Sequence, residues 1–89
     1  MKTIWIYSVH PGYNEHMIPE GYQILSVHTQ FGIPQIWVQV DPKNSLVPVW
    51  LFCAETGHNF PENIKLTRFI GTFLIESDAL VFHLFEIKR

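Results

Sequence analysis

Hydrophobic and polar residues alternate along most of the chain with the two-residue period of β-strands, and helical spacing is nowhere sustained. Pro and Gly interrupt the alternation at intervals of about ten residues, which is typical of short strands joined by turns. The pattern therefore predicts about six strands, connected in sequence order. The candidate segments, one of them a short return strand at 15–18, are residues 3–9, 15–18, 22–30, 35–41, 46–54, 68–75 and 79–87.

The best hairpin is predicted between residues 22–30 and 35–41. In its first strand, Leu25 and Val27 are expected on one face and Ile24 on the other. A second hairpin is expected from 68–75 and 79–87, with the polar turn Glu76-Ser77-Asp78 between them.

The strand at 35–41 alternates most regularly. Trp37 lies on its polar face, between Gln35 and Gln39, and an exposed aromatic residue in such a position is a typical interface anchor. These three residues therefore form one candidate binding surface. The opposite face carries three aliphatic residues expected in the core: Ile36, Val38 and Val40.

Two further segments are apolar on both faces. Residues 46–54 contain Pro48, which cannot donate to a strand ladder, so we expect this strand at a sheet edge or with a bulge. Residues 80–86 contain no such breaker and are expected to form a central core strand. Between the predicted strands, Asp41 opens a turn cluster in which its carboxylate can accept from nearby backbone amides.

The segment from Thr56 to Lys65 has no strand pattern, and Pro61 permits at most one short helical turn near 60–66. The expected fold is mostly β: a single domain over residues 1–89, in which an antiparallel meander forms a small barrel or a curved sheet.

The composition suits association with a partner. Apolar residues make up 47% of the chain and aromatic residues 15%, whereas charged residues make up only 16%. A chain of 89 residues cannot hide so many large apolar side chains in one core. We therefore expect a homo-oligomer, a dimer or larger.

Charge and cysteine usage exclude several classes. The net charge is −2 and there are six Lys and Arg residues, too few for a basic stripe that would bind duplex nucleic acid. The single Cys53 forms no internal disulfide, and its apolar neighbours predict a buried thiol in a reducing cytoplasm. No signal peptide and no apolar run of membrane-spanning length is present, so no membrane association is expected.

Catalytic and metal-binding patterns are weak. The five histidines fall in different predicted elements, and a metal site would have to combine His58 with His28 or His83. Glu55 and His58 can meet across a glycine turn as a carboxylate–imidazole pair, but a plain turn is the commoner outcome. We therefore expect no enzymatic activity, no catalytic residues and no cofactor or metal.

The candidate binding residues, for a protein or a small ligand, fall into two groups. The first is Trp37 with Gln35 and Gln39. The second would line a nucleotide pocket at an oligomer interface, since one or two cations with an aromatic wall can hold a phosphate and a base. It comprises Trp50, His58, Lys65 and Arg68.

The chain resembles a family of short, functionally uncharacterised proteins of tailed phages and prophages. The likeness covers nearly the full length and rests on the ordered motifs Ile4-Trp5, Ile24-Leu25-Ser26-Val27, Thr56-Gly57-His58, Ile70-Gly71-Thr72-Phe73 and Leu80-Val81-Phe82-His83.

The resemblance implies a setting, the cytoplasm of an infected bacterial host, and transfers no activity. The resulting expectation is a non-catalytic accessory protein that binds and inhibits a host protein, such as an antiviral defence component. Two alternatives remain open: an oligomeric sponge for a small nucleotide signal, and a histidine-based metal-binding protein.

Overall fold

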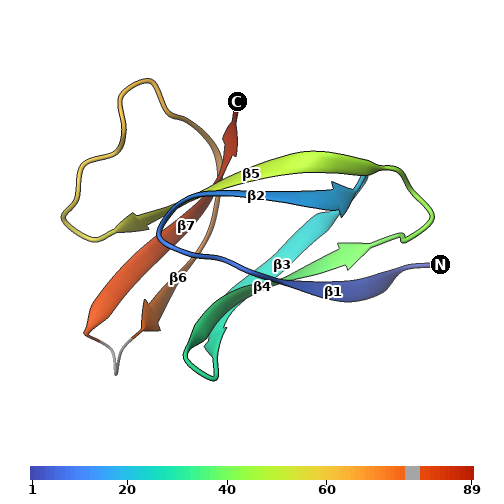
Figure 1. Ribbon diagram of the computed structural model, residues 1–89, viewed down its shortest axis with the longest axis horizontal. Coiled ribbons are helices and arrows are strands. Elements are labelled where there is room, and N and C mark those ends of the chain that lie inside the picture. Colours follow the sequence, from blue (N-terminus) through green and yellow to red (C-terminus); the bar gives the residue numbers. More distant parts are fainter. Residues whose placement is uncertain (76–78) are drawn as a thin grey trace.

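The chain folds into two antiparallel β-sheets. The structure is a computed structural model that describes residues 1–75 and 79–89 (Figure 1). Within these ranges there are seven strands and no helix. The strands are β1 (Thr3–Ser8), β2 (Gly12–Pro19), β3 (Gln23–Gln30), β4 (Ile33–Val40), β5 (Leu46–Glu55), β6 (Lys65–Ile75) and β7 (Leu80–Lys88).

The smaller sheet has the strand order β1-β4-β3, and the larger has the order β2-β5-β7-β6. Both predicted hairpins are confirmed, since β3 pairs with β4 and β6 pairs with β7. Phe31 and Gly32 connect β3 to β4 with backbone φ angles of 52° and 78°, the left-handed region that a tight turn uses. The predicted turn at Glu76-Ser77-Asp78 lies outside the described residues.

The prediction of a mostly β, antiparallel fold is confirmed. The details differ, because the described ranges hold seven strands and not about six, and these strands form neither a barrel nor a single curved sheet. In the described part of the chain the strand ladders form two separate sheets and do not close. Side chains join the edges β3 and β6 instead: the Arg68 guanidinium donates to the Ile24 carbonyl at 3.0 Å, and the Thr29 hydroxyl donates to the Leu74 carbonyl at 2.6 Å. The larger sheet therefore lies against the smaller one.

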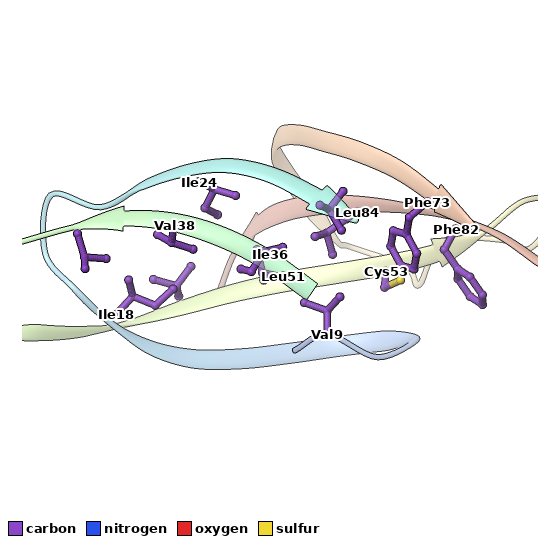
Figure 2. Close-up of a cluster of buried hydrophobic side chains, with 13 residues drawn as sticks. Val9, Ile18, Ile24, Ile36, Val38, Leu51, Cys53, Phe73, Phe82 and Leu84 are labelled. Carbon is purple, nitrogen blue, oxygen red and sulfur yellow. The ribbon is translucent and has the colours of Figure 1, made fainter. Parts of the chain in front are cut away.

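The core lies between the two sheets, and both contribute to it (Figure 2). Ile24, Ile36 and Val38 come from the smaller sheet, and Leu51 and Leu84 from the larger one; each is at most 1% exposed. Phe73 and Phe82 stack with ring centroids 5.8 Å apart at one end of the cluster. The expected inward face of Ile36, Val38 and Val40 is confirmed.

In the described part of the chain, three of the five strand pairings join strands that are not consecutive in sequence: β1–β4, β2–β5 and β5–β7. Residues 15–18 belong to an eight-residue strand, β2, which pairs with β5 and not with β1.

For residues 46–54 the prediction is a strand at a sheet edge or with a bulge. As a whole β5 is not an edge strand, because it lies between β2 and β7, and neither register shows a shift. Pairing with β7 begins only at Trp50, however, so the part of β5 that contains Pro48 has β2 as its one neighbour and does lie at a sheet edge. β7 is a central strand, as expected.

The predicted faces of β3 are wrong because of a β-bulge. The register with β4 shifts between Ile24 and Ser26, which inserts one extra residue. Ile24 and Val27 are consequently both buried, whereas Leu25 is exposed. A bulge changes the phase of alternation and cannot be seen in the alternation itself.

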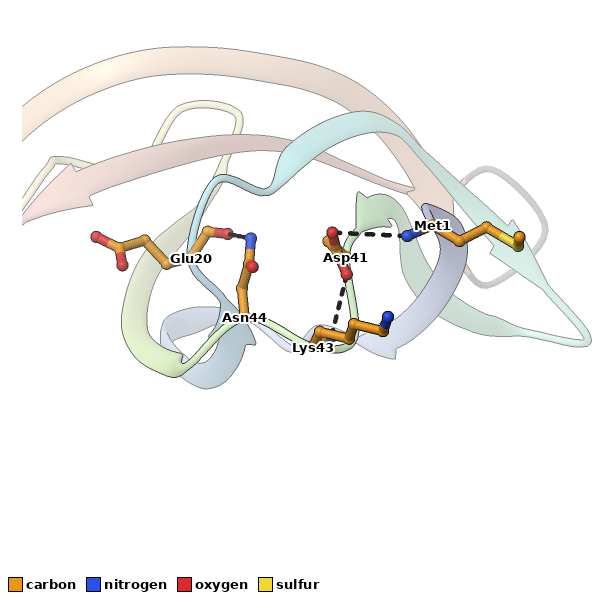
Figure 3. A network of polar contacts seen from close by, with 5 residues as sticks. All are labelled: Met1, Glu20, Asp41, Lys43 and Asn44. Carbon is orange, nitrogen blue, oxygen red and sulfur yellow. Dashed lines mark hydrogen bonds and ion pairs between the residues drawn. The ribbon is translucent and has the colours of Figure 1, made fainter.

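The turn after β4 has the predicted chemistry. The Asp41 carboxylate accepts from the Lys43 backbone amide at 3.1 Å, and its other oxygen lies 3.8 Å from the Met1 amino group (Figure 3). The Asn44 side-chain amide donates to the Glu20 carbonyl at 2.9 Å, which ties this turn to the end of β2. No helical turn forms at 60–66; Asn63 has a φ of 64°, and β6 begins at Lys65.

Candidate binding surface

The outer surface of the smaller sheet centres on Trp37. Because Ile36 and Val38 point into the core, the intervening Trp37 side chain lies on the opposite face, where it is half-buried. Gln35 and Gln39 share that face and are also half-buried. The structure thus brings together the three residues of the first predicted group.

β1 extends this surface with two isoleucines that the sequence did not single out. Ile6 lies opposite Trp37 and Ile4 lies opposite Gln39, and directly opposed residues share a face. Ile4 is 55% exposed and Ile6 is 46% exposed. On the other side of Trp37, the His28 ring of β3 lies edge-to-face with the indole, and the two ring centroids are 6.0 Å apart. We call this surface the Trp37 face; it comprises Ile4, Ile6, His28, Gln35, Trp37 and Gln39.

The Trp37 face ends at an edge strand without the usual protection. β1 is the outermost strand of the smaller sheet and lies with the amino terminus at the margin of the molecule (Figure 1). Edge strands normally carry charges, proline or a bulge that block pairing with another chain. β1 has none of these, and its register with β4 is regular over six residue pairs. It is apolar on both faces, because Trp5 and Tyr7 alternate with Ile4 and Ile6.

One end of β1 is covered by β2. The Nε2 atom of His16 lies 2.7 Å from the Ser8 carbonyl oxygen, within hydrogen-bonding distance. The centroids of the His16 and Tyr7 rings are 5.1 Å apart. Thr3, Ile4, Trp5 and Ile6 are all exposed, whereas Tyr7 is half-buried. The accessible pairing edge is therefore the amino-terminal two thirds of β1.

The connection from β1 to β2 is held by a buried asparagine that sequence reasoning missed. The Asn14 side chain accepts from the His10 amide at 2.9 Å and donates to the carbonyls of His10 and Gly12 at 2.8 and 3.1 Å. Asn14 is only 4% exposed. Three hydrogen bonds from one side chain fix the corner and so set the course of β1.

The second predicted group does not come together. Trp50 lies on the outer face of the larger sheet, opposite Glu15 and Ile87. Arg68 uses its guanidinium to join β6 to β3. His58 lies in the loop after β5, and Lys65 lies at the start of β6. Within one copy of the chain, Trp50, His58, Lys65 and Arg68 therefore do not line a common pocket, and a pocket that they would line at an interface between copies stays a prediction.

The Glu55–His58 pair does form. The His58 Nε2 atom lies 3.5 Å from a Glu55 carboxylate oxygen, and the His58 side chain is 68% exposed. His83 is nearby, but its two ring nitrogens lie 2.6 and 3.0 Å from the hydroxyls of Thr56 and Thr72. These contacts use both nitrogens of His83 and hold the loop against β6 and β7.

Within residues 1–75 and 79–89, no three His, Cys, Asp or Glu residues are placed to hold a metal ion together. His28 contacts Trp37 on the smaller sheet, while His58 follows the larger one, so the predicted combination of these two is absent. The described ranges also contain no helix with the length and apolar character that crossing a bilayer requires.

Three protonatable side chains in the described residues have a raised pKa. Burial raises the pKa of the Cys53 thiol to about 12, so the thiol is protonated at neutral pH and is a poor nucleophile. Burial, followed by the hydrogen bond to the Glu86 carboxylate, raises the pKa of Tyr22, and burial also raises the pKa of Tyr7. All three groups stay neutral inside the fold, as structural side chains do.

The fold and the surface define a class: a two-sheet antiparallel β protein whose smaller sheet ends in an exposed apolar strand. The chain belongs to the family described as a domain of unknown function (DUF7352), whose model matches residues 1–89. No curated protein and no solved structure shows significant similarity. The match therefore establishes the family and assigns no function to it.

Proposed function

We propose that this protein is a non-catalytic binding protein that inhibits a host protein by contact through β1 and the Trp37 face. The observation that carries the proposal is the unprotected edge of β1, flanked by the exposed side chains of Ile4 and Ile6. A partner strand can add to this edge through main-chain hydrogen bonds, while the side chains of the Trp37 face select the partner. Trp37 is the anchor, because half-buried tryptophan contributes strongly to interfaces.

The biological setting in this proposal is a bacterial cell infected by a tailed phage. It rests on the motif resemblance described above and on the small size of the chain. The target class is a component of antiviral defence in the host cytoplasm. An inhibitor that acts by covering its target's surface needs no catalytic group. The exposed apolar surface of β1 and the Trp37 face suits such a role.

The same surface also suits self-association in the absence of the target. Two β1 strands related by a two-fold axis pair antiparallel, and each then presents the same residues to the other. We therefore include a homodimer in the proposal as the resting form, which the target displaces. Light scattering should then give twice the chain mass of 10.4 kDa for the isolated protein.

Affinity capture with matched variants tests the proposal. The immobilised wild-type protein and two variants are each exposed to bacterial lysate. Trp37→Ala removes the anchor, and Ile4→Lys adds a charge to the edge of β1. Met17→Lys is the control, because Met17 is 49% exposed on β2, an edge strand of the other sheet. We expect one host protein to be retained by the wild type and the control and lost from both other variants.

Two results would contradict the proposal. One is the absence of any protein retained by the wild type but not by Ile4→Lys. The other is a retained protein that Met17→Lys loses and Ile4→Lys keeps, since this would place the interface on the larger sheet. Urea unfolding of each variant shows whether it is folded, and we expect little change because the three positions tested lie outside the buried core.

A further inference from the structure

β1 exposes apolar side chains on both of its faces, and this feature limits what can pair with it. Ile4 and Ile6 lie on the Trp37 face and are 55% and 46% exposed. Trp5 lies opposite Val38, which is fully buried, so Trp5 is on the core-facing side of the smaller sheet. It is nevertheless 38% exposed, so the larger sheet does not cover it fully. The free edge therefore has uncovered apolar side chains on both sides of the sheet.

A strand that pairs with this edge meets both sets of side chains. Directly opposed residues share a face, so successive side chains of the added strand lie alternately beside Ile4 or Ile6 and beside Trp5. An edge strand of a folded antiparallel sheet usually alternates apolar and polar residues, because one of its faces meets water. Such a strand would place polar groups against Trp5 or against the two isoleucines. A segment with apolar residues at successive positions covers both sets.

The smaller sheet itself carries no formal charge. Its strands β1, β3 and β4 contain no Asp, Glu, Lys or Arg. Lys2 directly precedes β1, is exposed, and lines a groove of about 400 Å³ together with Thr3, Ile4 and Gln39. Within residues 1–75 and 79–89, no carboxylate forms an ion pair with Lys2. The edge is thus complementary to a segment whose apolar run is uncharged and whose end carries a carboxylate.

We infer that β1 recognises an extended segment that is apolar at the positions opposite residues 3–6 and carries an acidic residue beside Lys2. This inference rests on the proposed function and names the class of partner for the same surface. The segment comes from a terminus or loop of the target, since a run that is apolar on both faces is otherwise found in buried strands. β1 of a second copy is also apolar on both faces, which agrees with a homodimer as the resting form.

Fluorescence anisotropy with three labelled peptides tests the inference. The probe peptide is Gly-Asp-Ile-Val-Ile-Val-Asp-Gly, in which an aspartate precedes and follows the apolar run, so that either strand direction places one beside Lys2. One reference peptide has Ser in place of both Val residues and is apolar on one face only. We expect it to bind at least about tenfold more weakly than the probe, because apolar burial on the second face is lost. The other has Lys in place of both Asp residues and should bind about two- to fivefold more weakly, as for loss of an exposed ion pair.

Variants of the protein assign each preference to its side chain. Trp5→Thr should bind the probe and the serine peptide with affinities that differ by less than about threefold, because the contact with the valines is gone. Phe69→Thr is the matched control, since it removes a 55% exposed aromatic residue from β6 and should keep the wild-type preference. Lys2→Gln should lose the preference for aspartate over lysine, whereas Lys65→Gln on β6 should keep it. Melting curves show that each variant is folded.

The titrations separate this inference from the proposed function. Equal binding of the probe and the serine peptide by the wild type, or no binding of any peptide, would overturn the inference. An unchanged aspartate preference in Lys2→Gln would overturn the placement of the acidic residue. A host protein captured through Ile4 by a protein that does not distinguish the peptides would keep the β1 interface and reject the class of segment. Selective peptide binding without any captured host protein would support the inference and reject the host target.

Discussion

At Gly71, β6 of the larger sheet lies close against β3 of the smaller one. A Cβ atom added there would lie 2.8 Å from the Cγ1 atom of Val27, a distance that real Cβ contacts do not show. Val27 is buried and β-branched, so it has little freedom to move away. The glycine in the motif Ile70-Gly71-Thr72-Phe73 therefore allows β3 to pack against β6.

Gly71→Ala should destabilise the protein by about 1–3 kcal/mol through overpacking. Urea unfolding measures the change in the free energy of unfolding. Adding Val27→Ala removes the clashing methyl group, so the double variant should lose less stability than the sum of the two single variants. Additive losses would show that the contact between the two positions does not limit packing.

Cys53 makes the stability of the fold depend on alkaline pH. Its pKa is raised by burial from the ordinary value of 9.0 to about 12. Above pH 9 the unfolded chain loses the thiol proton while the folded chain keeps it, so the unfolded state binds fewer protons and is favoured as pH rises. Tyr22 acts in the same direction, because its pKa is also raised.

The free energy of unfolding should therefore fall between about pH 9 and pH 12, with Cys53 contributing up to about 1.4 kcal/mol per pH unit. Urea unfolding across this range measures the slope. Cys53→Ala should give a shallower slope, with the remainder attributable in part to Tyr22. A slope unchanged by Cys53→Ala would contradict the assignment to this thiol.

Among the elements, the corner between β1 and β2 determines where the binding edge lies. Asn14→Ala removes the three hydrogen bonds of the side chain and leaves the His10 amide without this partner. We expect a loss of about 1–3 kcal/mol in the free energy of unfolding. Urea unfolding checks the loss, and a change below about 0.5 kcal/mol, as at ordinary surface positions, would show that Asn14 does not hold the corner.

The strands could be predicted from the sequence, but most of their partners could not. The β3–β4 and β6–β7 hairpins depend on local alternation and a short turn, which are visible in the chain. The pairings of β1 with β4 and of β2 with β5 join strands that other strands separate in sequence. Alternation specifies which residues share a face of one strand, and it does not specify which strand lies beside it.

The candidate surface was predictable to the same extent. Trp37, Gln35 and Gln39 share a face through alternation within one strand. Ile4 and Ile6 join them only because β1 pairs with β4 in the observed register.

At the scale of the whole molecule, the Trp37 face belongs to the smaller sheet, and β2 is an edge strand of the larger one. Substitutions on the two sheets therefore distinguish the two edges. Met17→Lys should leave capture of the host protein unchanged, whereas Ile4→Lys should abolish it.

The central claim is that a partner pairs with the edge of β1. Amide hydrogen exchange on the captured complex, compared with the isolated Ile4→Lys variant as an unpaired reference, tests it most directly. Pairing protects backbone amides that point away from β4, so exchange should slow within residues 3–6 and stay unchanged in Gly12–Pro19, an edge strand of the other sheet. Slower exchange in Gly12–Pro19 with unchanged exchange in residues 3–6 would contradict the account.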